Sequence, residues 1–213
     1  YGVIGIDLAS TGDDSTVATY MAHFDTGINV IDDSVESWSA FPEEELVQFI
    51  EKTCGKHPLD LVLIEKGMGA DADYSERYWY TELSDLMDIF GFQIDFRRPV
   101  TSKYARARPC ARSIRTGITK INEDLPTYRR LLEEYMYVHP DKQVLEQYPS
   151  PDAMDSVSIA FNLSNVMNGG ITSTGYEVKN PPKNAAKKRK RRYERPVYGT
   201  SFTSRMNEYH PIY

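Results

Sequence analysis

The sequence has few cysteines and no long apolar run, and each absence excludes a class of protein. Cys54 and Cys110 are the only cysteines among 213 residues, so a disulfide framework or a zinc site is not expected and a reducing compartment is favoured. No stretch of about 18 apolar residues occurs, so we expect no membrane span. A Gly-x-x-x-x-Gly-Lys-Ser/Thr phosphate loop is also lacking, which excludes an ATPase of that class within these residues.

Charge is unevenly distributed along the chain. The formal net charge is −6. Residues 168–213 nevertheless carry ten Lys or Arg and three acids, and residues 97–130 carry ten Lys or Arg and two acids. This segregation favours an anionic partner that contacts two local basic patches rather than the whole surface.

The composition changes near residue 169, where Gly, Pro, Asn, Lys and Tyr dominate without apolar periodicity. We therefore expect a domain over residues 1–168 and a basic, flexible C-terminal tail over residues 169–213. Residues Lys187–Arg192 are six consecutive basic residues that could bind DNA, dock a motor partner or act as a localisation signal. A plain solvated tail explains them equally well. Because residues 1–7 have the pattern of a strand rather than a signal peptide, we also expect the chain to be part of a longer polypeptide.

Apolar patterning predicts an α/β fold. Strands are expected at residues 3–7, 16–23, 28–38, 59–65, 91–96 and 117–121, and helices at residues 43–54, 74–90, 103–116, 125–138 and 152–167. An antiparallel meander followed by alternating helices and strands implies a mixed central sheet with helices on both faces. Pro109 should start or kink the helix expected at residues 103–116.

Three acids occupy positions that a hydrophobic core disfavours. Asp7 ends the first strand, Glu65 ends the fourth, and Asp155 lies in a helix whose other residues are largely apolar. Buried carboxylates are costly unless they are paired or bind a cation. Adjacent strand ends and a packed helix can gather the three at one sheet edge, where hard oxygen ligands favour Mg²⁺ or Mn²⁺. Taken singly, each acid also fits an ordinary role as a turn former or a solvated side chain.

The order of the motifs resembles the nuclease domain of large terminase subunits from tailed bacteriophages, which belongs to the ribonuclease H-like group. The matching segments are Gly5–Ala9 with Gly12–Val17, Leu63–Glu65 with Gly69, Lys103 with Arg106, Gly117–Ile118, and Asp152–Ser156. One departure is that many relatives have His-Asp-Asp where this chain has Ser150, Pro151 and Asp152.

This resemblance implies a ribonuclease H-like mixed central sheet and cleavage of duplex DNA during viral genome packaging in the host cell cytoplasm. It places Asp7, Glu65 and Asp155 as catalytic ligands of two Mg²⁺ or Mn²⁺ ions. Two such ions about 4 Å apart can activate a water and stabilise the leaving oxygen of a phosphodiester. The resemblance also implies an ATPase domain upstream in the same polypeptide, with a portal and a small terminase subunit as partners.

Asp152 and Asp14 are further candidate metal ligands. Asp152 shares a helical face with Asp155, but it follows Ser150 and Pro151 in a first turn where the helix dipole favours an acid without any metal. We therefore expect Asp155 to be a direct ligand and Asp152 an accessory group. Asp14 lies in an acidic turn, where an acid is common without a metal.

Basic residues between positions 103 and 115 are candidates for DNA binding through phosphates. Lys103 is also a candidate for orienting the scissile phosphate. The alternative is a solvated basic helix. The candidates are Lys103, Arg106, Arg108, Arg112 and Arg115, of which the last three share a helical face by their spacing.

Three alternatives remain open. A Holliday-junction resolvase, a transposase or a ribonuclease H would use the same acids on a different substrate. Residues 4–16 also resemble the first phosphate loop of actin-like sugar kinases, although the second loop of that fold is lacking. A catalytically inactive DNA-binding module is the third.

Overall fold

The computed structural model describes residues 1–9, 15–39, 42–65, 71–97, 99, 101–137 and 150–167. Its strands are β1 (Gly2–Asp7), β2 (Thr16–His23), β3 (Asn29–Ser37), β4 (Leu61–Glu65), β5 (Gln93–Arg97) and β6 (Thr119–Ile121). Its helices are α1 (Glu43–Lys56), α2 (Asp71–Phe90), α3 (Lys103–Arg115), α4 (Tyr128–Tyr137) and α6 (Asp152–Met167). These elements follow the predicted order, and α2 begins three residues earlier than the sequence suggested.

Asp14 and the predicted tail over residues 169–213 lie outside the described residues, so the predictions for them stay predictions. Among the described helices, none is long and apolar enough to cross a membrane.

The six strands form one mixed sheet in the order β5-β4-β1-β2-β3-β6. The meander β1-β2-β3 is antiparallel, whereas β4 runs parallel to β1, β5 parallel to β4, and β6 parallel to β3. The α/β class predicted from the sequence, a mixed central sheet with helices on both faces, is therefore confirmed.

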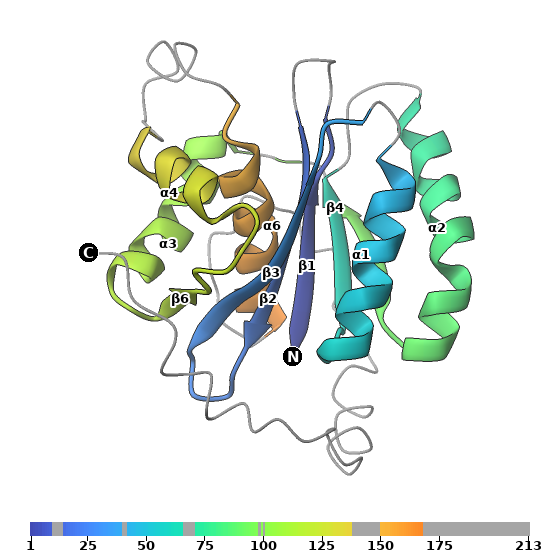
Figure 1. Ribbon diagram of the computed structural model, residues 1–213, viewed down its shortest axis with the longest axis horizontal. Coiled ribbons are helices and arrows are strands. Elements are labelled where there is room, and N and C mark those ends of the chain that lie inside the picture. The colour runs from blue at the N-terminus through green and yellow to red at the C-terminus, as the bar shows by residue number, and fades with distance from the viewer. Residues whose placement is uncertain are drawn as a thin grey trace.

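Alternating side chains of the strands build two cores, one on each face of the sheet. Val3, Val17 and Met21 pack with residues of α3, α4 and α6 on one face. Ile4 and Ile6 pack with residues of α1 and α2 on the other. Figure 1 shows the sheet nearly edge-on between these two layers of helices.

The helix α6 lies closest to the sheet. Its residues 152–162 are all buried, because β1 and β2 lie beneath it while α3 and α4 cover it. Gly5 makes the close approach possible, since a Cβ at that position would lie 2.3 Å from the carbonyl oxygen of Ser156. The missing side chain on β1 thus sets the distance at which α6 packs.

The helix α3 continues through Pro109 rather than starting there. Ser102 caps its N-terminus by accepting a hydrogen bond at 3.3 Å from the backbone N–H of Ala105. Pro109 follows as an internal residue. A helix start at Pro109 is therefore excluded, because the serine cap about two turns earlier already supplies the start, and the alternative of a kink at Pro109 stays a prediction.

Candidate metal centre and nucleic-acid face

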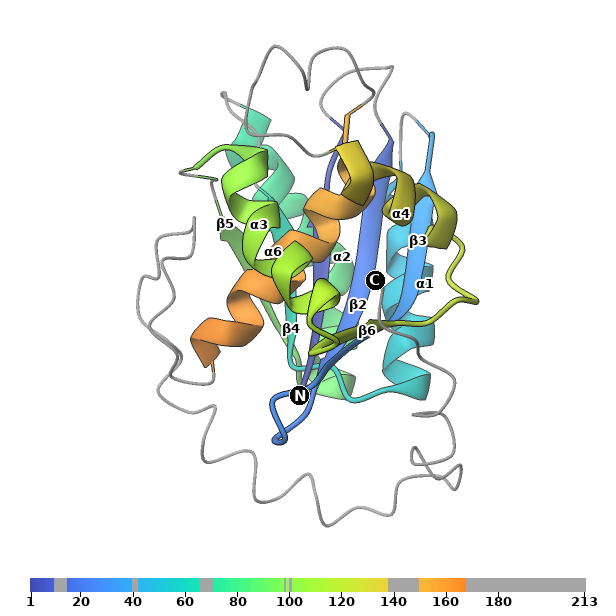
Figure 2. The same cartoon turned by 90° about the vertical axis from the view of Figure 1, so that its left-hand side faces the viewer.

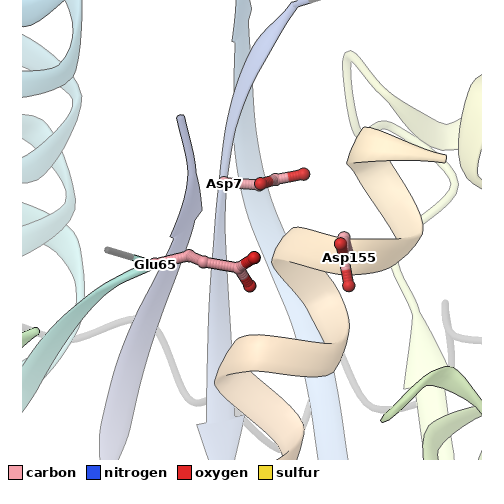
Figure 3. A group of neighbouring side chains, drawn as sticks. All are labelled: Asp7, Glu65 and Asp155. Atoms are coloured by element: carbon pink, nitrogen blue, oxygen red, sulfur yellow. The ribbon is translucent and has the colours of Figure 1, made fainter. Parts of the chain in front are cut away.

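The three acids singled out by the sequence meet at one edge of the sheet. Asp7, Glu65 and Asp155 each offer one carboxylate oxygen, and these oxygens lie within 4.8 Å of one another. Figure 3 shows Asp7 and Glu65 extending from neighbouring strands toward the helix that carries Asp155. The sheet and α6 thus bring together residues that are far apart in the sequence.

Strand register explains why Asp7 and Glu65 are neighbours. In the parallel pair β1–β4, Ile6 lies opposite Ile64, so the next residue of each strand is an acid at the same sheet edge. Carboxyl ends of parallel strands are where α/β sheets commonly place their sites. Asp155 reaches this edge from the first turn of α6, held close by the gap that Gly5 leaves.

Burial makes it costly to keep the three carboxylates ionised. The exposed fraction of Asp155 is 1% and that of Asp7 is 7%. Burial raises the pKa of Asp7 well above its ordinary value, the charge of Asp155 raises it further, and Lys103 lowers it only in part. Acids that repel one another in a poorly solvated place favour a bound cation.

Lys103 provides one positive charge at the centre. Its Nζ lies 3.1 Å from Asp155 Oδ2, 3.6 Å from Asp7 Oδ2 and 3.8 Å from Asp152 Oδ1. Burial lowers the pKa of Lys103, but the charges of Asp7 and Asp155 outweigh this and raise it above its ordinary value. The side chain is 37% exposed, so the ammonium group sits between the buried acids and solvent.

Arg106 provides a second positive charge, in a place the sequence did not suggest. We expected it to face phosphates, yet its exposed fraction is 3%. Its Nη2 donates to both carboxylate oxygens of Asp155, at 2.9 and 2.8 Å, and lies 3.3 Å from Glu65 Oε2. Its Nη1 donates to the carbonyl oxygen of Thr101 at 2.8 Å. In this arrangement Arg106 contacts the acids rather than the outer surface.

Asp152 lies next to the acid cluster but has its own partners. Its Oδ2 accepts hydrogen bonds from the backbone N–H and the hydroxyl of Ser15, at 3.3 and 3.2 Å. The same oxygen accepts from Arg130 Nη2 at 2.8 Å. This geometry fits the accessory role expected for Asp152, since one of its oxygens is already committed.

Arg130 and Glu134 also contribute to the site, and the sequence analysis did not single them out. Arg130 joins α4 to Glu36 on β3, to Asp152 and to Glu134, four residues further along its own helix. Glu134 Oε2 accepts from the backbone N–H of Met154 at 2.6 Å and so caps the start of α6. Burial raises the pKa of Glu134 to about 7, against the hydrogen bonds from Met154 and Arg130 that lower it. The i,i+4 spacing was visible in the sequence, but its link to α6 was not.

The remaining arginines of α3 line a separate concave surface. Arg108, Arg112 and Arg115 are exposed, and none makes an ion pair with any residue in the described part of the chain. They border an open cavity of about 510 Å³. Figure 2 looks onto the face where α3, α4 and α6 pack. The other lining residues are Tyr104, Ala111, Tyr135, Met136 and Met154.

The donor set at the sheet edge fits a hard divalent cation. It consists of carboxylate oxygens from three elements, which is the ligand type preferred by Mg²⁺ and Mn²⁺. Asp7 and Glu65 are held by adjacent strands and Asp155 by a buried helix, so ligand positions are fixed by the fold.

No protein-family model and no curated protein matches the sequence. Solved structures of similar fold include the fowlpox virus Holliday junction resolvase, at 12% identity and a TM-score of 0.44 over 78% of this chain and 99% of that chain. RuvC of T. thermophilus, in complex with a Holliday junction substrate, is similar at 10% identity and a TM-score of 0.43 over 79% of this chain and 97% of that chain. The yeast mitochondrial Holliday junction resolvase Ydc2 is similar at 14% identity and a TM-score of 0.38 over 74% and 76%.

Two of these proteins are named as Holliday junction resolvases, the first alternative that the sequence left open, and the third is bound to a Holliday junction substrate; none of the three is named as a terminase. A likeness at these identities and TM-scores does not by itself assign a substrate.

Proposed function

We propose that this chain is a divalent-metal-dependent endonuclease of the ribonuclease H-like group that hydrolyses phosphodiesters of DNA. The observation that carries the proposal is the convergence of Asp7, Glu65 and Asp155 within 4.8 Å at the end of a mixed sheet. Solvated surface acids have no reason to face one another in a buried place, because their mutual repulsion and desolvation are both costly.

A bound divalent ion would supply Lewis-acid polarisation of the phosphate and a lowered pKa for the attacking water. The protein's own residues contribute position and charge. Asp7, Glu65 and Asp155 would hold the ion. Lys103 lies at the solvent side of the acids, where its ammonium group can orient the scissile phosphate and hold it toward Asp7.

The exposed arginines of α3 would bind the DNA backbone beside the centre. The helix begins at Lys103, which contacts the acids, and ends at Arg115. At 1.5 Å per residue it spans about 20 Å, the length of duplex axis over which one strand presents about six phosphates at a rise of 3.4 Å each. Arg108, Arg112 and Arg115 follow this path with i,i+4 and i,i+3 spacing.

The nuclease proposal is tested by plasmid cleavage in Mg²⁺, in Mn²⁺ and in chelator. We expect cleavage with either metal and none in chelator. The variants Glu65→Gln and Asp155→Asn should lose cleavage while their circular dichroism spectra remain those of a folded protein. Undiminished cleavage in chelator, or in both variants, would refute the proposal.

The DNA-binding face is tested by salt-dependent affinity in chelator, where no cleavage takes place. The variant with Arg108→Gln and Arg112→Gln should bind all duplex sequences more weakly, and its salt dependence should flatten by about 0.9 per lost phosphate contact. Arg129→Gln is the matched control, since Arg129 is exposed on α4 and does not line the cavity. Because the control removes one charge and the test variant removes two, an equal loss per removed charge would assign the effect to overall charge.

The finer assignment has two candidates within the same chemistry. The order of the five motifs favours the nuclease part of a large terminase, which would act in the host cell cytoplasm beside an ATPase domain, a portal and a small terminase subunit. The junction resolvase is the alternative. Cleavage of linear duplex against four-way junctions of the same sequence separates them: a packaging nuclease should cut both without preference, whereas a resolvase should cut symmetrically at the branch point.

A further inference from the structure

Two cations are already built into the acid cluster. Lys103 lies between Asp7 and Asp155, and Arg106 lies between Asp155 and Glu65. Asp155 contacts both of them, and its two oxygens each accept a hydrogen bond from Arg106 Nη2. Of the three acids, Asp155 is therefore the one most engaged by the protein's own cations.

Arg106 differs from Lys103 in how firmly it is held. Lys103 is 37% exposed in its side chain, whereas the side chain of Arg106 is 3% exposed. The carbonyl oxygen of Thr101 holds one arm of the guanidinium and Asp155 holds the other. A guanidinium stays charged in proteins, and removing one member of a buried ion pair leaves an uncompensated charge. Displacement of Arg106 by a metal ion is thus strongly unfavourable.

The charge balance at the centre also disfavours a second divalent ion. The three converging carboxylates face the two positive charges of Lys103 and Arg106. Asp152, 3.8 Å from Lys103, is left out of this set because it already pairs with Arg130. One divalent ion would turn the balance of this set slightly positive. Two ions would place four further positive charges on a set that has a single negative charge left, in a place where solvent screens poorly.

We propose that Arg106 takes the place of a second cation at this centre, so that the protein without substrate binds one divalent ion tightly. Asp7 and Glu65 would be the principal ligands of that ion. Asp155 would contribute the carboxylate lone pairs that do not accept hydrogen bonds from Arg106. Arg106 is then a positioning residue that determines how many divalent ions the protein binds. The inference rests on the proposed metal-dependent function, and it reduces the two ions expected from the sequence to one in the protein alone.

The test is the number of Mn²⁺ ions bound by the full chain without DNA, measured by isothermal titration calorimetry and by electron paramagnetic resonance of bound Mn²⁺. We expect one tight site in the wild type and in Arg106→Lys, which keeps the charge. In Arg106→Gln we expect a second site, or an affinity for the first ion that is higher by at least about tenfold. Arg108→Gln is the matched control, because it removes the same charge from an exposed position on the same helix.

Thermal unfolding supplies a second readout. In chelator, Arg106→Gln should unfold at a lower temperature than wild type, because Asp155 and Glu65 lose a counter-charge. Saturating Mn²⁺ should raise its unfolding temperature by more than it raises that of the wild type. If Arg106→Gln does not fold, the wild type remains a test, because two tight ions there would overturn the proposal.

Two tight Mn²⁺ ions in the wild type would overturn the role of Arg106 and leave the nuclease proposal intact. A folded Arg106→Gln with the same stoichiometry and affinity as wild type would do the same. If neither protein binds Mn²⁺ by either method, the metal-dependent function itself fails, and this inference fails with it.

Discussion

The molecule has two sets of buried or partly buried acids, one where α6 packs on the sheet and one on β3, and they differ in what each carboxylate faces. At the carboxyl ends of β1 and β4, the oxygens of Asp7, Glu65 and Asp155 face one another. On β3, Asp32 and Asp33 are also buried, with exposed fractions of 7% and 8%. Among the described residues, this second pair belongs to no group of converging metal-binding side chains.

Each acid of β3 has partners that are not acids. Asp32 Oδ1 accepts a hydrogen bond from Asn122 at 3.0 Å, and its Oδ2 lies 3.5 Å from His57 Nε2. Asp33 Oδ2 lies within 3.7 Å of the ammonium groups of two lysines on α1, Lys52 and Lys56. Burial of an acid is therefore a weak sign of function, and convergence with other acids is the stronger one.

The largest expected contrast between the two sets is in cleavage. Asp7→Asn should lower cleavage by at least about a hundredfold, because it removes a metal ligand. Asp32→Asn should leave cleavage unchanged. The measurement is the initial rate of plasmid cleavage in Mn²⁺.

The same two variants should change stability in opposite directions in chelator. Asp7 has a raised pKa, so its ionised form is unfavourable in the folded state and its replacement by Asn should raise the unfolding temperature. Asp32→Asn weakens the contact with His57 and should lower it. A shift of the same sign in both variants would show that the two sets do not differ as described.

The second prediction concerns the close packing of α6 on β1, which brings Asp155 to Asp7 and Glu65. Gly5→Ala should push α6 away from β1, because the added Cβ would lie 2.3 Å from the carbonyl oxygen of Ser156. We expect a loss of about 1–3 kcal/mol in the free energy of unfolding and weaker Mn²⁺ binding. Urea unfolding and calorimetry measure the two effects.

Gly55 provides the control, since a Cβ there meets nothing within 4 Å. Gly55 lies within α1, so Gly55→Ala should be neutral or stabilise by about 0.5–1 kcal/mol and leave Mn²⁺ binding unchanged. Unaltered metal binding in Gly5→Ala would mean that the distance between β1 and α6 does not set the site.

The third prediction separates two acids of the same helix. Asp155→Asn should abolish cleavage and lower Mn²⁺ affinity. Asp152→Asn should lower cleavage by about tenfold, because Asn can still accept from Ser15 but loses the charge that pairs with Arg130. Loss of Mn²⁺ binding in Asp152→Asn with activity retained in Asp155→Asn would reverse the two roles.

The smallest expected effect is a dependence of stability on pH through Glu134. Its folded-state pKa is raised from 4.5 to about 7, so the stability it contributes is fully present below pH 4.5 and is lost as the pH rises to about 7. Glu134→Gln cannot ionise. The difference in unfolding temperature between wild type and Glu134→Gln should therefore change over this range and be constant above it. A difference that is constant from pH 4 to pH 8 would show that Glu134 does not titrate there.

The element order could be predicted because apolar periodicity is a local property. The apolar and β-branched residues of 16–23 and the apolar run at 59–65 predict strands, and the strands are found at 16–23 and 61–65. Asp7 and Glu65 could be singled out for the same reason, since each ends such a run. The register that places them side by side, with Ile6 opposite Ile64, is a contact between distant segments and no local pattern contains it.

Arg106 shows the limit of this reasoning most clearly. A local signal existed, because Arg106 has helical spacing from Cys110 and Ile114, both of which are buried in α3. The sequence placed it instead with the basic residues around it. Its charge suggested solvent or phosphate, and only the presence of Asp155 and Glu65 opposite that face makes a buried guanidinium favourable.

The sequence by itself thus determined the secondary structure, the fold class and the three acids, because these follow from patterns within short segments. The tertiary structure decided which charges meet. It placed Arg106 in the acid cluster and left Arg108, two residues away, at the surface, because α3 turns one face toward α6 and the other toward solvent. It also linked Arg130 of α4 to Asp152 of α6. Electrostatic energies depend on distances between side chains from different elements, and those distances exist only once the sheet and helices have packed.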